Sequence, residues 1–137
     1  MKKLGLIGLI LFLCFHYSAQ CDPDPIYADS SWGIWPENFQ DGVEGQSYSQ
    51  IVDVKVPQDA GVFNPSYSGF TISNITLEEI SGLPNGLSYD CNNIDCSWDA
   101  NSQGCFAILG VPSDTGYFSF SYNLIAAINF FGVMIEY

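Results

Sequence analysis

Apolar and polar residues alternate along several short stretches of the chain. The clearest stretch is residues 48–56, where one side of an extended backbone would carry Tyr48, Gln50, Val52, Val54 and Val56. A period of two predicts a half-buried β-strand, and Pro57, which lacks a backbone N–H, ends it. Residues 70–80 predict one or two more strands, with an interruption expected at Ser73 and Asn74.

The centre of the pattern is residues 82–120. Two runs there, 87–91 and 105–109, each offer one apolar face at a period of two, and Gly- and Pro-containing turns frame them. These features predict a β-hairpin with a cysteine-rich insert between its strands. Two further strands are predicted between residues 117 and 137. Since no long helical period follows residue 19, the chain is predicted to be an all-β sandwich.

The first residues predict export. Lys2 and Lys3 precede the apolar run 4–15, which is as long as a signal-peptide core and short for a membrane span. The expected organisation is a cleaved signal peptide (1–19), an extended N-terminal arm (20–45) and one sandwich domain (46–137). Acylation of Cys21 as a lipid anchor is the alternative, because a cysteine follows the apolar run closely.

Charge narrows the class of partner. Removal of residues 1–19 takes the formal net charge from −12 to −14 and leaves Lys55 as the only cationic side chain. Nucleic acids and anionic membrane surfaces are bound through clustered Lys and Arg, so both partner classes are excluded. The many carboxylates favour solubility outside a cell over a dedicated acidic site.

Four cysteines remain after the signal peptide, which predicts two disulfides in a secreted chain: Cys21, Cys91, Cys96 and Cys105. A zinc site is the rival, but its ligands usually come in two close pairs. In the hairpin, Cys91 and Cys105 have opposite parity and should point to different faces. We therefore predict one disulfide between Cys96 and Cys105 and another between Cys21 and Cys91.

Two motifs carry a family resemblance. Leu83-Pro84-Asn85-Gly86-Leu87, followed by Gly110, Pro112, Gly116 and Tyr117, resembles an immunoglobulin-like domain of bacterial surface proteins. The cysteine insert and Cys21-Asp22-Pro23-Asp24 resemble secreted Bacteroidetes proteins that the type IX system exports. The resemblance implies an immunoglobulin-like β-sandwich. It also implies that the domain continues past Tyr137, so that this chain is truncated and the rest of a larger surface protein is its partner.

The inventory of reactive groups predicts no enzyme. No histidine follows the signal peptide, so neither a Ser-His-Asp nor a Cys-His arrangement can form. Asp99, Asn101 and Gln103, with Gly104, match the first half of a calcium loop, which makes them weak candidate ligands. Gly110 stands where that loop needs a bidentate Glu, and turns also use such residues, so we favour a turn without metal or other cofactor.

Aromatic side chains suggest a second kind of site. Trp32 and Trp35 in the arm can form a sugar-stacking platform or can fill the core, and we favour core filling. We expect Trp98 to cover the cysteine insert and at most one of Trp32 and Trp35 to be exposed. The leading hypothesis is a non-catalytic adhesion or spacer module, secreted or at the cell surface. The alternatives are a carbohydrate-binding module and, more weakly, a calcium-dependent cadherin-like domain; the partner would be a surface protein or glycan.

Overall fold

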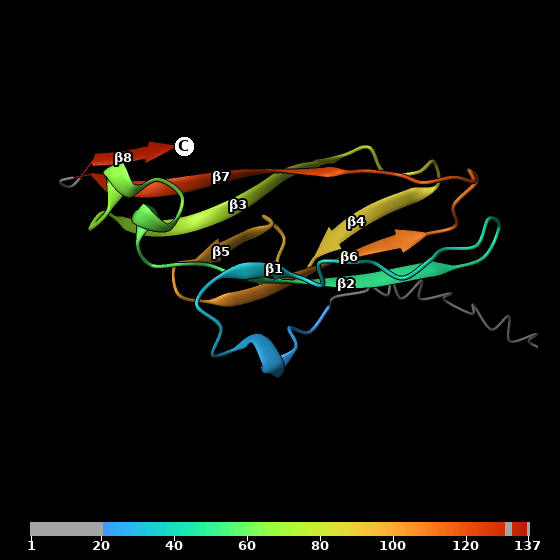
Figure 1. Cartoon of the computed structure of the whole chain (residues 1–137), viewed down its shortest axis with the longest axis horizontal. Helices are drawn as coiled ribbons and strands as arrows, with labels where there is room; N and C mark the ends of the chain where they lie inside the picture. Colours follow the sequence, from blue (N-terminus) through green and yellow to red (C-terminus); the bar gives the residue numbers. More distant parts are fainter. Residues whose placement is uncertain (1–20, 131–132, 137) are drawn as a thin grey trace, which may run out of the picture.

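The structure is a computed structural model that describes residues 21–130 and 133–136. These residues form two antiparallel sheets that face each other (Figure 1), as the alternating pattern predicts. The first sheet has the order β1 (Gly33–Trp35), β2 (Tyr48–Lys55), β6 (Gln103–Gly110) and β4 (Leu87–Cys91). The second has the order β5 (Ser97–Asp99), β3 (Thr71–Ser81), β7 (Ser121–Phe130) and β8 (Val133–Glu136). The predicted signal peptide lies outside the described residues.

The helical content of the described ranges is limited to three short 3₁₀ turns. These are η1 (Pro25–Tyr27), η2 (Ala60–Val62) and η3 (Pro65–Tyr67). The side chains of Asp24, Asp59 and Asn64 cap them by accepting hydrogen bonds from backbone N–H groups. No helix in these ranges is long and apolar enough to cross a membrane.

The core lies between the sheets and is built from alternate residues of the strands. In β2 the predicted inward side chains Val52 and Val54 are buried, and in β6 Phe106 and Ile108 meet them. The second sheet supplies Ile72, Ile75, Leu77, Ile80, Ala126 and Ile128. Burial of apolar area at this seam is the main favourable term in folding.

Strand β3 keeps its apolar residues inward by means of two irregularities. The pairing of β3 with β7 shifts register between Ile72 and Asn74 and again between Leu77 and Glu79. A bulge inserts one residue and reverses the facing of those that follow. Ile72 and Ile75, three positions apart, therefore both reach the core. The interruption predicted at Ser73-Asn74 is a bulge within one strand.

Two strands could not be predicted from the alternating pattern because they are short. Strand β1 lies in the segment predicted to be an extended arm, and it pairs with the far end of β2. Strand β5 lies within the cysteine insert and crosses to the second sheet, where it pairs with β3. Each has three residues, too few for alternation to be visible.

The predicted hairpin of β4 and β6 is confirmed, with Cys91 opposite Phe106. Cys91 points into the core and Cys105 lies on the outer face of the first sheet, as parity predicts. The predicted pairing is nevertheless wrong: the disulfides join Cys21 to Cys105 and Cys91 to Cys96.

The physical reason for the wrong pairing lies in the arm and in the insert. The arm crosses the outer face of the first sheet (Figure 1), which brings Cys21 to Cys105. The insert folds back at Cys96, whose φ of 48° permits a tight turn toward the end of β4. The two inward-facing cysteines therefore meet each other, and the two on the outer face do the same.

Trp98 of β5 fills the space between the insert and the first sheet, with 4% of its surface exposed. Its indole Nε1 donates a hydrogen bond to Asn92 Oδ1 at 2.7 Å. The ring lies against Gly104, where an added Cβ would sit 2.0 Å from Trp98 Cδ1. Trp98 therefore covers the cysteine insert, as expected, and does so because Gly104 has no side chain.

Removing the two disulfides should destabilise the fold unequally. Cys21–Cys105 closes a loop with a sequence separation of 84, and Cys91–Cys96 one with a separation of 5. Loop-closure entropy predicts losses of about 4–5 kcal/mol and about 2 kcal/mol, respectively. We expect urea unfolding to show the larger loss for the double variant Cys21→Ala/Cys105→Ala. A larger loss for Cys91→Ala/Cys96→Ala would contradict the loop argument.

Gly104→Ala should destabilise the fold by about 1–3 kcal/mol, because overpacking forces the indole from its place. In Trp98→Leu the indole is absent, so adding Gly104→Ala to that variant should have a much smaller effect. The measurement is a double-mutant cycle of unfolding free energies. Equal effects of Gly104→Ala in both backgrounds would show that the Trp98 contact is not the cause.

Candidate functional site

Trp32 and Trp35 belong to two separate aromatic pairs. Trp35 is half-buried and stacks on Tyr27, with ring centroids 4.6 Å apart and planes within 5°. Trp32 meets Phe63 edge-on at 5.4 Å and is 43% exposed. The expectation that at most one of these two tryptophans is exposed is confirmed. The two rings have different partners, and the structure does not assemble them into one pair.

The candidate calcium segment forms the turn between β5 and β6. Ser102 donates hydrogen bonds from its N–H and its hydroxyl to the Asp99 carbonyl, and Asn101 has a φ of 60°. The side chain of Gln103 donates to the carbonyl of Asp24 at 2.6 Å, and thus reaches the arm. The described residues contain no group of three His, Cys, Asp or Glu side chains placed to hold a metal ion.

The arm makes a polar contact with the first sheet at Asp53, which is the only buried charged residue described and is 5% exposed. Its Oδ1 accepts a hydrogen bond from Asp24 N at 2.7 Å. Burial raises the pKa of Asp53, and the nearby Asp24 carboxylate adds to the rise, whereas hydrogen bonds from Asp24 N and Gln103 lower it. Sequence reasoning missed this contact because Asp53 has the outward parity of β2.

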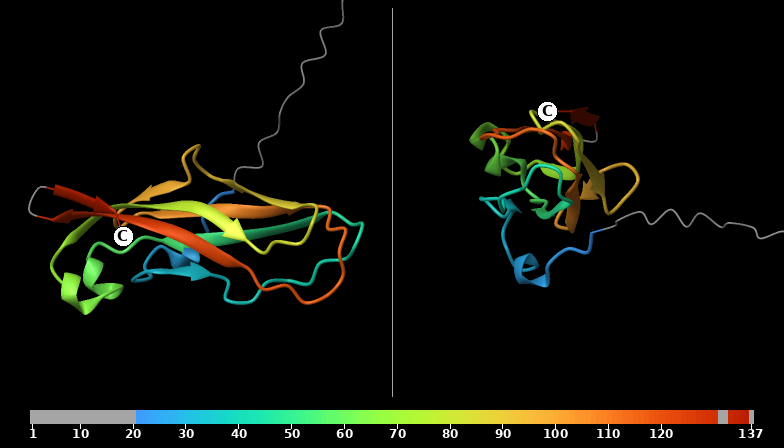
Figure 2. Two further views of the ribbon diagram at one scale, coloured as in Figure 1. Left: turned by 90° about the horizontal axis from the view of Figure 1, so that it is seen from above. Right: turned by 90° about the vertical axis from the view of Figure 1, so that its right-hand side faces the viewer.

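A groove with a volume of about 740 Å³ lies at one end of the sandwich. We call it the end groove. Its walls come from residues 37–44, between β1 and β2, and from residues 112–120, between β6 and β7. Figure 2 shows these two loops side by side at the same end of the molecule. Tyr48, Leu87, Ile108 and Tyr122, from strands of both sheets, also line it.

Close approach of two turns shapes this end. Val111 N donates to the Gly86 carbonyl at 3.1 Å, and Ser113 N donates to the Asn85 carbonyl at 2.9 Å. A Cβ on Gly110 would sit 2.1 Å from the Gly86 carbonyl oxygen, so a side chain there would separate the turns. The Gly- and Pro-rich motifs of the sequence thus bring residues 82–86 and 110–116 together, and both turns contribute residues to the lining of the groove.

Aromatic rings line the end groove. Phe39 and Phe120 pack with centroids 5.0 Å apart, and Phe120 meets Tyr122 edge-on at 5.7 Å. Tyr117 is fully exposed and Phe118 is exposed in the same loop. An exposed apolar group is ordinary when it stands alone, but rings gathered at a hollow are typical of a binding surface.

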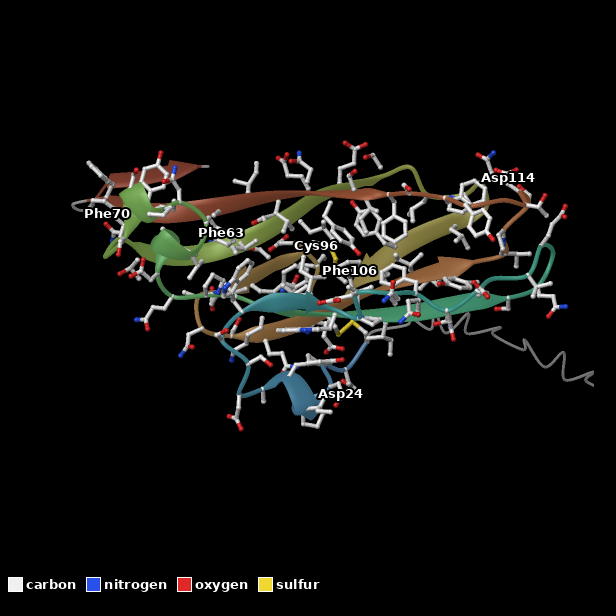
Figure 3. The ribbon with its side chains drawn as sticks, in the orientation of Figure 1. Asp24, Phe63, Phe70, Cys96, Phe106 and Asp114 are labelled. Carbon is white, nitrogen blue, oxygen red and sulfur yellow. A yellow bond between two sulfur atoms is a disulfide. The ribbon has the colours of Figure 1, made fainter. Side chains whose placement is uncertain are left out.

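Carboxylates also line the end groove: Glu37, Asp41, Glu44 and Asp114. Asp114, labelled in Figure 3, is held in place because its Oδ2 accepts hydrogen bonds from Asn85 N at 3.1 Å and Nδ2 at 2.8 Å. Burial raises the pKa of Tyr48, and the Asp41 carboxylate raises it further. The hydroxyl of Tyr48 donates to the Gln40 carbonyl at 3.1 Å.

Comparisons with known proteins add no relative. No protein-family model, no curated protein and no solved structure matches the chain.

Asp53→Asn should change how stability depends on pH. Folding raises the pKa of Asp53, which means that the folded state binds the proton more tightly than the unfolded state. Its contribution to the free energy of unfolding is therefore complete below the unfolded pKa and is lost as the pH rises through the folded pKa. Asparagine keeps an acceptor for Asp24 N without the charge. We expect the melting temperature of the wild type, relative to Asp53→Asn, to fall as the pH rises above about 4, the usual pKa of an aspartate.

The matched control is Asp95→Asn, which removes an exposed carboxylate on the insert. Its melting temperature should show no such divergence. A wild type that gains stability over Asp53→Asn as pH rises would contradict the assigned direction of the pKa.

Proposed function

We propose that the chain is a non-catalytic, extracellular immunoglobulin-like module that serves adhesion or spacing in a bacterial surface protein. The observation that carries the proposal is strand order. Constant-type immunoglobulin domains place strands A, B, E and D in one sheet and C, F and G in the other. Taking β1, β2, β3, β4, β6, β7 and β8 in turn as A to G reproduces both orders, with β5 added beside C.

The disulfides support an extracytoplasmic location. Cys21–Cys105 and Cys91–Cys96 use every cysteine in the described ranges, and such bonds persist in oxidising compartments. Low content of basic residues and the absence of histidine after residue 16 fit a module whose role is contact rather than catalysis. The resemblance of the turn and cysteine motifs to secreted Bacteroidetes proteins supports the same assignment.

The location can be tested with the full chain produced in a Gram-negative host. We expect the protein to leave the cytoplasm, and its cysteines from Cys21 onward to resist alkylation until a reductant is added. Mass spectrometry of alkylated, fractionated samples measures both properties. Recovery of the chain in the cytoplasm with free thiols would contradict the proposal.

A retention assay under flow then distinguishes an adhesion function from a spacer function. Beads that carry the oxidised chain should be held on a partner surface if the module is an adhesin. The same beads should wash off all surfaces if it is a spacer. Beads that carry the reduced, alkylated chain provide the control, because loss of both disulfides removes the fold that the contact needs.

A further inference from the structure

The end groove combines two features that recognise the same chemical group. Its rings offer π faces, with Tyr117 and Phe118 exposed at the surface. Its carboxylates, from Glu37, Asp41 and Glu44, are exposed on the opposite loop. Ammonium and guanidinium groups are attracted both by aromatic faces and by carboxylates.

The groove contains no cation of its own within the described ranges. Lys55 is the only cationic side chain in the described ranges, and it lies outside the groove. Its Nζ donates to the Asn101 carbonyl at 3.2 Å, in the turn between β5 and β6. Asp114 is oriented by Asn85, and apart from Lys55 the described part of the chain has no cationic side chain that could pair with the groove carboxylates. Negative charge at this end therefore remains available to a partner.

We propose that the end groove binds a lysine- or arginine-bearing segment of a partner protein. The rings contact the apolar stem of the basic side chain, and the carboxylates face its charged head. Charge favours this occupant over a glycan, because a neutral sugar can hydrogen-bond to the carboxylates but gains no attraction between opposite charges, and an anionic sugar is repelled. The proposal rests on the adhesion function proposed above and names the chemistry of its partner.

The test uses the full, oxidised chain and a short fluorescent peptide in which lysine alternates with glycine. Fluorescence anisotropy should show saturable binding that weakens as salt rises from about 0.05 M to about 0.5 M, because the charges are exposed. The same peptide with every lysine acetylated should bind much more weakly. Neutral maltohexaose, added as competitor, should not displace the lysine peptide.

Variants locate the site. Tyr117→Ala removes a fully exposed ring, and Asp41→Asn removes a carboxylate on the facing loop, so both should leave the fold intact. Each should weaken peptide binding about tenfold. Ile94→Ala and Asp95→Asn are the matched controls on the cysteine insert, and they should leave affinity unchanged.

Three results would overturn the proposal. These are no binding of the lysine peptide, equal weakening in the groove and control variants, and Tyr117-dependent binding of maltohexaose in place of the peptide. The last would make the groove a glycan site. Retention of beads under flow, with no peptide binding, would reject this partner chemistry alone. Recovery of a reduced cytoplasmic chain would instead reject the extracellular function.

Discussion

The structure depends on burying one face of each sheet against the other. An isolated sheet of this size would leave its apolar face in water. When the two sheets pack face to face, each removes the apolar face of the other from water. Phe106 and Ile108 of the first sheet share a core with Ile72 and Ile128 of the second, and all four are almost fully buried. The two bulges of β3 serve the same constraint, because without them half of its apolar residues would face solvent.

The outer face of the first sheet has its own cover. Cys105 and Ala107 point away from the main core, yet both are buried, because the arm lies across them and is bonded through Cys21. Strand β6 is thus enclosed on both sides. Asp53 shares this face, and its contact with Asp24 N gives the arm a fixed hydrogen bond beside the disulfide.

The all-β architecture, β2, the β4–β6 hairpin and the approximate course of β3 and β7 could be predicted, because each of these strands is long enough to show its period. The cover over β6 left a signal too: Cys105, Phe106, Ala107, Ile108 and Leu109 are apolar at every position, which is typical of a strand buried on both faces. Strand parity correctly placed Cys91 and Cys105 on opposite faces of the sheet. It could not predict that the arm would bring Cys21 to the outer face, or that Cys96 would turn toward the inner one. The end groove could not be predicted, because it forms where loops about seventy residues apart meet, and strand periodicity does not encode that meeting.

The bond between Cys21 and Cys105 also determines how the module carries force. Tension applied at residue 21 and at β8 would pass through the sulfur bridge directly into β6, and from there through β7. Residues 22–104 would form a closed covalent loop that this tension cannot draw out, and they would resist it only through the pairing of β2, β3 and β4 with β6 and β7. Only the segment beyond residue 105 could lengthen, at about 3.3–3.6 Å for each residue drawn out. Under pulling, the molecule would therefore be a short tether with most of its sandwich shielded from extension.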